Sequence, residues 1–223
     1  MAGAKSDSIC PAGARNCPFL DEIIRLKEQC HQLETLSQVD ALTGLFNFRY
    51  LMKALEMEIE RTRRSRLPTG LVMIDLDHFK RVNDAHGHQI GNLTLCWVGK
   101  VWKDNIRLID IPCRYGGEEF ALILPSTSLA QSIEIAERLR RAIKAHPLKV
   151  DRSHLSITAS FGVAVFRHNE GLTGDDFIAR ADHYLLEAKL GGRDRICTQE
   201  PEPSFDDGVS PEEKSGLFGT NQD

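Results

Sequence analysis

The chain contains several stretches in which apolar residues recur every three or four positions, and this spacing predicts amphipathic helices. These stretches run from about residue 19 to 39, from Asn47 to about Arg66, from Leu129 to Ala145 and from Asp175 to Leu190. Asn47 is a suitable N-cap for the second helix. The last turn of that helix is rich in arginine, which stabilises the negative end of the helix dipole.

Runs of β-branched and other apolar residues predict strands at Leu71–Ile74 and Leu155–Phe166, with a short last strand at Ile196. Gly162, inside the second run, indicates close packing or a bulge. A further helix is expected from about Asn92 to Lys103.

Two apolar arms, Ile109–Cys113 and Ala121–Pro125, enclose a glycine pair, and this pattern predicts a β-hairpin. Tight hairpin turns need positive φ, which glycine adopts without steric strain. Glu118 and Glu119 follow the glycines directly. Carboxylates at a hairpin tip are usually solvated surface groups, so on their own they indicate only an exposed turn.

A second acidic stretch changes that interpretation. The strand Leu71–Ile74 runs into Asp75-Leu76-Asp77. A buried strand that ends in carboxylates can meet the hairpin acids and hold a hard cation between them. Asp75 is the better candidate ligand of the two strand-end acids, with Glu118 opposite it. The order of elements predicts an α+β fold in which helices pack on a sheet.

Composition narrows the function classes. The 223 residues fit one domain with appendages, 41% are hydrophobic, and the formal net charge is −4. The tail 198–223 carries seven acids and one lysine, which leaves the rest of the chain slightly positive. No apolar run approaches the roughly 18 residues that span a bilayer, and the start lacks a signal-peptide core. We therefore expect a cytoplasmic protein with neither a membrane nor a nucleic-acid partner.

The two ends are expected to be disordered: residues 1–18 are small and polar, and residues 198–223 are acidic and rich in proline. Six cysteines without a secretory signal are more often free thiols than disulfides. Cys96 and Cys113 lie in apolar patterns typical of a core. A structural metal bound near the N-terminus is a minor alternative. Its candidate ligands are Cys10, Cys17, Cys30 and His31, but their spacing matches no tight ligand pair.

Six short motifs occur in a fixed order, at residues 40–47 (DALTGLFN), 75–84 (DLDHFKRVND), 87–92 (GHQIGN), 107–110 (RLID), 116–120 (GGEEF) and 188–193 (AKLGGR). Together they resemble the GGDEF family of diguanylate cyclases, in a GGEEF form, over about residues 38–197. The resemblance implies a ferredoxin-like, palm-like nucleotide cyclase fold with a central, mostly antiparallel sheet. It also implies condensation of two GTP into cyclic di-GMP and two pyrophosphates, with Mg²⁺, or Mn²⁺ as the alternative, as cofactor.

The resemblance assigns roles to the acidic residues. Asp75, the main-chain carbonyl of Leu76 and Glu118 would bind metal. Glu119 would be the second hairpin carboxylate, and either assists a metal or accepts the proton of the attacking 3′-hydroxyl. The sequence leaves that choice open.

The resemblance also places substrate and product. Asn83 and Asn92 would read the base, and the turn that holds His78, Phe79 and Lys80 would lie against phosphate. Lys189 and Arg193 would bind the terminal phosphates, although cations at a helix end are common without such a role. Arg107 and Asp110 match the family's product-inhibition site, which binds cyclic di-GMP.

Asn92 departs from the family, which usually has aspartate there. An aspartate offers two acceptors to the two donors of guanine, whereas asparagine offers one acceptor and one donor. Either guanine binding is weakened or relayed by water, or the site also accepts ATP and yields mixed cyclic GMP-AMP.

Two further alternatives concern assembly and activity. One domain holds one GTP, so the family forms a homodimer of facing half-sites, and residues 19–39 would be the means, as a coiled coil or as a single amphipathic helix packed on its own domain. A degenerate domain could instead act as a cyclic di-GMP receptor, but the intact acids and phosphate-binding cations argue against this.

Overall fold

The computed structural model of the chain describes residues 22–29, 38–150 and 153–199. Residues 22–29 form a helix inside the stretch predicted to be helical. Val39 instead forms an isolated β-bridge with Phe46, so the helical stretch ends before Val39. The predicted disorder at 1–18 and at 200–223 falls outside the described residues, as do Cys10, Cys17, Cys30 and His31. At residues 198 and 199 the prediction of disorder is wrong, because Thr198 ends the last strand and the Gln199 side chain accepts the N–H of Val165 at 3.1 Å.

The rest of the described chain is a mixture of helices and strands, as the sequence predicted. Its elements are α2 (Phe48–Ser65), β1 (Thr69–Leu76), α3 (Phe79–Lys103), β2 (Ile111–Gly116), β3 (Glu119–Leu124), α4 (Leu129–Ala145), β4 (Leu148–Val150), β5 (Ser153–Leu155), β6 (Ala159–Phe166), α5 (Gly174–Leu190) and β7 (Ile196–Thr198).

The main sheet has five strands in the order β2-β3-β1-β6-β7. β1 pairs antiparallel with β3 on one side and with β6 on the other, and only the β6–β7 pair is parallel. β1 is therefore the central strand, and every one of its residues is buried. The predicted α+β fold with a mostly antiparallel central sheet is confirmed.

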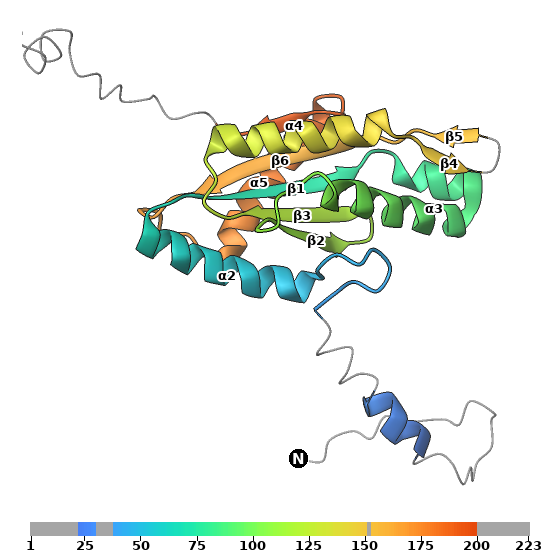
Figure 1. Cartoon of the computed structure of the whole chain (residues 1–223), viewed down its shortest axis with the longest axis horizontal. Coiled ribbons are helices and arrows are strands. Elements are labelled where there is room, and N and C mark those ends of the chain that lie inside the picture. The colour runs from blue at the N-terminus through green and yellow to red at the C-terminus, as the bar shows by residue number, and fades with distance from the viewer. Residues whose placement is uncertain (1–21, 30–37, 151–152, 200–223) are drawn as a thin grey trace, which may run out of the picture.

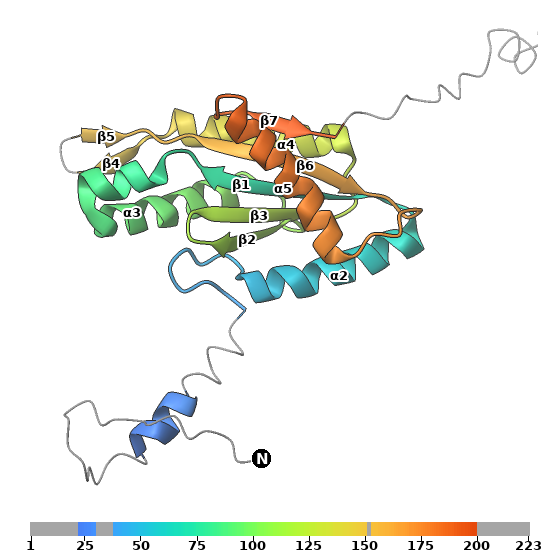
Figure 2. The same ribbon diagram turned by 180° about the vertical axis from the view of Figure 1, so that it is seen from behind.

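Helices cover both faces of this sheet. α3 and α4 lie on the near side of the sheet in Figure 1, and α5 crosses the opposite face in Figure 2. Each face has its own buried cluster, because alternate residues of β1 point to opposite sides: Val72 and Ile74 pack with α3 and α4, whereas Leu71 and Met73 pack with α2 and α5. Among the described residues, no helix is long and apolar enough to cross a bilayer.

Two segment predictions need correction. The run Leu155–Phe166 is not one strand: Ser153–Leu155 pairs with Leu148–Val150 in a separate two-stranded sheet, and β6 begins at Ala159. Just before β6, Thr158 bonds to the residue that follows β1. Its carbonyl accepts the N–H of Asp77, at 2.8 Å.

The helix expected from Asn92 begins earlier. α3 starts at Phe79 and contains a kink at Gly87, whose φ of 80° and ψ of 161° are not helical. The predicted turn after Asp75 therefore opens into a short first helical piece, and a second piece carries Asn92. Gly162 shows the predicted close packing, since a Cβ there would lie 2.1 Å from the carbonyl oxygen of Ala181 on α5.

Candidate active site

Asp75 and Glu119 face each other across neighbouring strands. They are register partners in the β1–β3 pair, and Asp75 is paired with Ser160 of β6 on its other side. Both carboxylates follow the alternation that points toward α5, the face on which Met73 and Ala121 are buried. Strand pairing alone therefore brings the strand-end acid and a hairpin acid together.

The hairpin turn is held in place from two sides. Gly117 has a φ of 48°, as the glycine pair predicted, and the backbone N–H of Leu76 donates to the carbonyl of Glu118 at 3.3 Å. The guanidinium of Arg114 donates to the carbonyl of Gly117 at 2.7 Å and also pairs with Asp40 at 3.2 Å. Arg114 thus connects the loop at residues 40–47 with the turn that carries the two glutamates.

The acids form a region of concentrated negative charge. Burial raises the pKa of Asp75, Glu118 and Glu119, and neighbouring carboxylates raise it further, against the opposing effect of Lys189. Lys189 lies in the last turn of α5, and its Nζ is 2.8 Å from Asp75 Oδ2. Because burial and mutual repulsion disfavour the ionised form of these carboxylates, a bound cation would stabilise them.

The donor set fits one kind of metal better than others. The described residues contain no group of three or more His, Cys, Asp or Glu side chains arranged as a complete metal site. Mg²⁺ in nucleotide enzymes is usually held by one or two carboxylates together with phosphates and water. Asp75, Glu118 and nearby main-chain oxygen match that pattern, whereas a site made by protein side chains alone is not present in the described part.

Asp77, the second strand-end acid, has a different role. Its carboxylate accepts hydrogen bonds from Thr158 Oγ1 at 2.6 Å, Ser160 Oγ at 2.7 Å and the backbone N–H of Asp194 at 3.0 Å. Because these partners occupy its oxygens, Asp77 fixes the end of β1. Asp75 is buried as well, but its carboxylate lies beside the hairpin acids and pairs with Lys189.

The groups predicted to bind phosphate lie at the same end of β1. α3 begins at Phe79, directly after the turn, and His78 before it adopts a left-handed conformation with φ of 57°. The exposed side chains of His78 and Lys80 and the N–H groups of this first turn are available to an anion. Arg193 is also left-handed, with φ of 62°, and its N–H donates to the carbonyl of Ala188 at 3.0 Å.

Asn83 and Asn92 lie on the two pieces of α3. Asn83 is half-buried and Asn92 is exposed. Gly91 lets the two pieces approach closely, since a Cβ on Gly91 would fall 1.9 Å from Asn83 Oδ1 and 3.3 Å from the ring of Phe79. The buried Phe79 ring thus lies beneath Gly91 and packs in the core, rather than projecting into solvent.

Comparison with known proteins identifies this arrangement. A family model described as "Diguanylate cyclase, GGDEF domain" matches residues 37–195. The chain belongs to the GGDEF family. The response regulator PleD of Caulobacter vibrioides is 40% identical to it over 168 residues, which make up 74% of this chain and 37% of that protein. The GGDEF chain thus spans well under half the length of that relative.

Solved structures agree with the family assignment. The diguanylate cyclase SiaD of Pseudomonas aeruginosa, solved with its activator SiaC, has a TM-score of 0.70 and 36% identity, and the match covers 81% of this chain and 72% of that one. The coiled coil and GGDEF domain of DgcB from Caulobacter crescentus, solved with c-di-GMP, has a TM-score of 0.69 and 29% identity, covering 80% and 94%.

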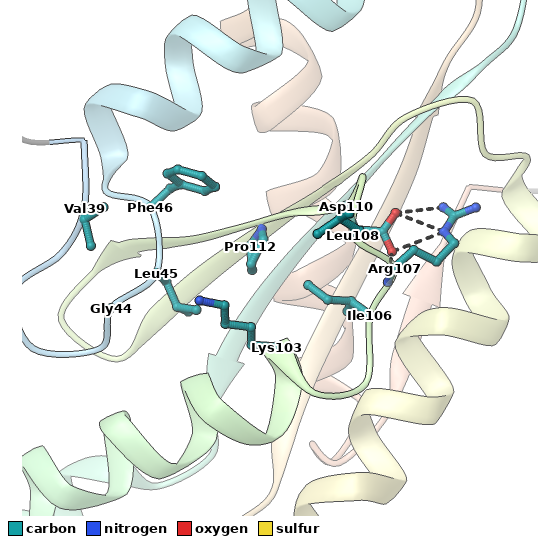
Figure 3. Close-up of a pocket in the computed structure, with 10 residues that line it drawn as sticks. All are labelled: Val39, Gly44, Leu45, Phe46, Lys103, Ile106, Arg107, Leu108, Asp110 and Pro112. Carbon is teal, nitrogen blue, oxygen red and sulfur yellow. Dashed lines mark hydrogen bonds and ion pairs between the residues drawn. The ribbon is translucent and has the colours of Figure 1, made fainter.

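The GGDEF domain also brings Arg107 and Asp110 together, before β2 (Figure 3). The guanidinium of Arg107 donates to Asp110 Oδ1 at 2.8 Å and to Thr127 Oγ1 at 2.7 Å, and the Arg107 N–H donates to Asp110 Oδ2 at 2.9 Å. The Asp110 carboxylate is fully buried, whereas Arg107 is partly exposed. A ligand at this pair would share the Arg107 guanidinium with Asp110, which is bound through Nε and Nη2.

A pocket of 570 Å³ adjoins this pair (Figure 3). It lies between the loop at residues 40–47 and the segment that leads into β2, and its walls are mainly apolar. The lining residues are Val39, Gly44, Leu45, Phe46, Lys103, Ile106, Arg107, Leu108, Asp110 and Pro112.

Sequence reasoning missed two residues that organise the site. Arg114 precedes the glycine pair, and the pattern gave no sign that it reaches back to Asp40. Asp194 follows Arg193 directly and is bound by two cations of α4, Arg140 and Lys144. The position of Asp194 directly after the predicted phosphate-binding motif was the available signal, but its partners are about fifty residues away along the chain.

Proposed function

We propose that this GGDEF domain condenses two molecules of GTP into cyclic di-GMP and releases two pyrophosphates. The observation that carries the proposal is the grouping of Asp75, Glu118 and Glu119 with Lys189 at one end of the central strand. This grouping provides acids that suit a divalent metal and a cation that suits phosphate. Family membership supports the same chemistry.

The reaction forms two bonds between a 3′-oxygen and an α-phosphorus, and breaks two α–β phosphoanhydride bonds. Mg²⁺, when bound with the nucleotide, would neutralise phosphate charge and polarise the α-phosphate. Asp75, Glu118 and the carbonyl of Leu76 would hold it. Lys189, Arg193 and the turn at His78 to Lys80 would bind the phosphates that leave.

The attacking 3′-hydroxyl must lose its proton. Glu119 is the candidate acceptor, since burial and the neighbouring Asp75 raise its pKa, and a carboxyl with a raised pKa holds a proton more readily. Its alternative role is to assist in holding the metal. The pyrophosphate leaves with the electrons of the broken phosphoanhydride bond.

Two domains are required, because each domain binds one GTP. The 3′-hydroxyl of the GTP in one domain must attack the α-phosphate of the GTP in the other domain. We infer a homodimer in which residues 19–39 bring two domains face to face. The helix at 22–29 lies inside this segment and supports the proposal.

A second candidate concerns the base. Asn92 is exposed on the helical piece that follows the kink at Gly87, next in sequence to Gly91, which packs against Asn83, and its amide presents both a donor and an acceptor. This pattern suits an adenine edge as well as it suits guanine. The second candidate function is therefore synthesis of mixed cyclic GMP-AMP from GTP and ATP.

The deciding experiment is turnover with Mg²⁺ and GTP, ATP or both, with products separated by chromatography and identified by mass. Asp75→Asn and Glu118→Gln should each reduce turnover to background, because each removes an anionic metal ligand. Glu134→Gln, an exposed acid on α4, is the matched control and should retain the rate. Substantial activity in both site variants would refute the metal assignment, and binding of cyclic di-GMP without turnover would favour the receptor alternative.

A further inference from the structure

The turn after α5 has an unusual backbone. Gly192, Arg193 and Asp194 all have positive φ, of 113°, 62° and 45°. Glycine adopts such values freely, but two consecutive residues with side chains do so only when surrounding contacts compensate for the strain. Arg193 and Asp194 must therefore be held in this conformation by contacts with the rest of the domain.

Asp194 supplies those contacts. Its carboxylate accepts from Arg140 Nη1 at 2.7 Å and from Lys144 Nζ at 2.7 Å, and both cations belong to α4. Its carbonyl accepts a second bond from Arg140 at 3.2 Å, and its N–H donates to Asp77 Oδ2 at 3.0 Å. The backbone and the side chain of one residue thus connect the turn to a helix and to the end of β1.

Arg140 is itself held rigidly. Glu137, one turn earlier on α4, accepts from its guanidinium at 2.7 Å and 2.9 Å. Charge-assisted bonds of this kind restrict the arginine to one orientation. Asp194 is therefore bound to a fixed group rather than to a freely moving surface side chain.

These contacts set the position of the phosphate-binding cation relative to the metal-binding acid. Asp77 lies two residues after Asp75, so the bond from Asp194 to Asp77 joins the turn to the strand that carries the acid. Lys189 joins α5 to Asp75 directly, at 2.8 Å. Arg193 lies between these two attachments, and its side chain is exposed on the turn.

We infer that Asp194, held by Arg140 and Lys144, is a positioning residue that keeps Arg193 in its left-handed conformation and directs it to the terminal phosphates of the substrate. The inference rests on the proposed function, because it takes a guanosine triphosphate as the ligand of Arg193. Asp194 itself touches neither substrate nor metal in this assignment.

The test measures binding of a non-cleavable triphosphate, α,β-methylene-GTP, and of GMP to the full chain in the presence of Mg²⁺. Asp194→Ala should weaken the triphosphate about tenfold, the effect of one misplaced charge-assisted contact, and leave GMP within about twofold. In turnover, KM for GTP should rise more than kcat falls. Asp194→Asn keeps an acceptor for Arg140 and should recover part of the affinity.

A double-mutant cycle separates positioning from general stabilisation. If Asp194 acts through Arg193, then adding Asp194→Ala to Arg193→Ala should change triphosphate affinity by less than about twofold. Additive losses, or equal losses for GMP and the triphosphate, would overturn the inference. Glu60→Ala, which removes an ion-paired acid on α2, is the control and should change neither affinity.

The outcomes also distinguish the inference from the proposed function. A wild-type domain that binds the triphosphate no better than GMP would overturn the assignment of phosphate binding and the inference together. A wild-type preference for the triphosphate that survives unchanged in Asp194→Ala would overturn the positioning role alone.

Discussion

Lys189 Nζ lies 2.8 Å from Asp75 Oδ2, so the carboxylate at the end of β1 forms an ion pair with a lysine of α5. Lys189 is attracted to Asp75, Glu118 and Glu119, but one ammonium cannot neutralise three carboxylates. The repulsion that remains between these carboxylates therefore lowers the stability of the folded domain when no metal is bound. A divalent cation that enters with substrate would remove it.

The first prediction follows from the sign of this effect. Folding raises the pKa of Glu118, first by burial and then by the charge of Asp75, so the ionised carboxylate destabilises the folded state. This loss is absent below the ordinary value of 4.5 and is complete above the raised pKa. Glu118→Gln should therefore melt at a higher temperature than wild type at pH 7 in chelator, although we expect it to lose turnover.

The measurement is thermal unfolding between pH 4 and pH 8, without metal. The difference between Glu118→Gln and wild type should shrink as the pH falls toward 4, because both side chains are then neutral. An equal or lower melting temperature for the variant at pH 7 would contradict the prediction. Glu134→Gln serves as the control for loss of one surface charge.

The second prediction concerns Gly91. A methyl group on Gly91 would fall 1.9 Å from Asn83 Oδ1, so Gly91→Ala must turn the Asn83 side chain away. If Asn83 reads the base, guanine nucleotide affinity should drop about tenfold, as for one lost hydrogen bond. The matched control is Gly99→Ala on the same helix, where the nearest atom would be 3.4 Å away. Equal nucleotide affinities in the two variants would remove Asn83 from the binding site.

The third prediction concerns Asn92, which departs from its family. Asn92→Asp gives guanine two acceptors for its two donors, and places a carboxylate against the acceptor N1 of adenine. The kcat/KM for GTP should rise by a few-fold to about a hundredfold, and any incorporation of ATP should fall. Competition between GTP and ATP in one reaction, with products resolved by mass, measures both. Unchanged kinetics and product ratio would show that Asn92 does not read the base.

The fourth prediction concerns product inhibition. Arg107→Ala removes the guanidinium that would bind the product, so progress curves should remain linear after wild type has slowed. The variant should also melt at a lower temperature, because the fully buried Asp110 loses its cation. Leu108→Ala changes an adjacent, fully exposed side chain and is the control.

Progress curves with added cyclic di-GMP complete that test. The product should slow wild type and Leu108→Ala but not Arg107→Ala. An Arg107→Ala variant that slows as wild type does, or a wild type that never slows, would mean that the pair has no inhibitory role in this chain.

Local patterns were enough to predict most elements. The periodic apolar residues gave α2, α4 and α5, and the glycine pair gave the β2–β3 hairpin, because these depend on neighbours within a few residues. The prediction of one strand over Leu155–Phe166 was wrong, because β-branched composition does not show where a strand begins or ends. The hydroxyl of Thr158, just before β6, donates to Asp77, a contact across 81 positions.

The candidate site divides in the same way. The acids were identified from their strand-end and hairpin positions, and the family resemblance supplied their expected roles. Two contacts were not predictable: Arg114 with Asp40, 74 positions apart, and Asp194 with Arg140, 54 positions apart. Such pairs depend on how helices and loops pack against the sheet, and single-sequence periodicity contains no information about that packing.

The strand order has a consequence for how the site opens. β1 is central, with β3 and β6 along its length, whereas the β2–β3 hairpin lies toward the edge of the sheet. Amide hydrogen exchange in β1 should therefore approach the rate of global unfolding, while the turn at Gly117 and Glu118 exchanges through local opening. Asp75 would then keep its position, whereas the turn that carries Glu118 would move when a nucleotide enters or leaves.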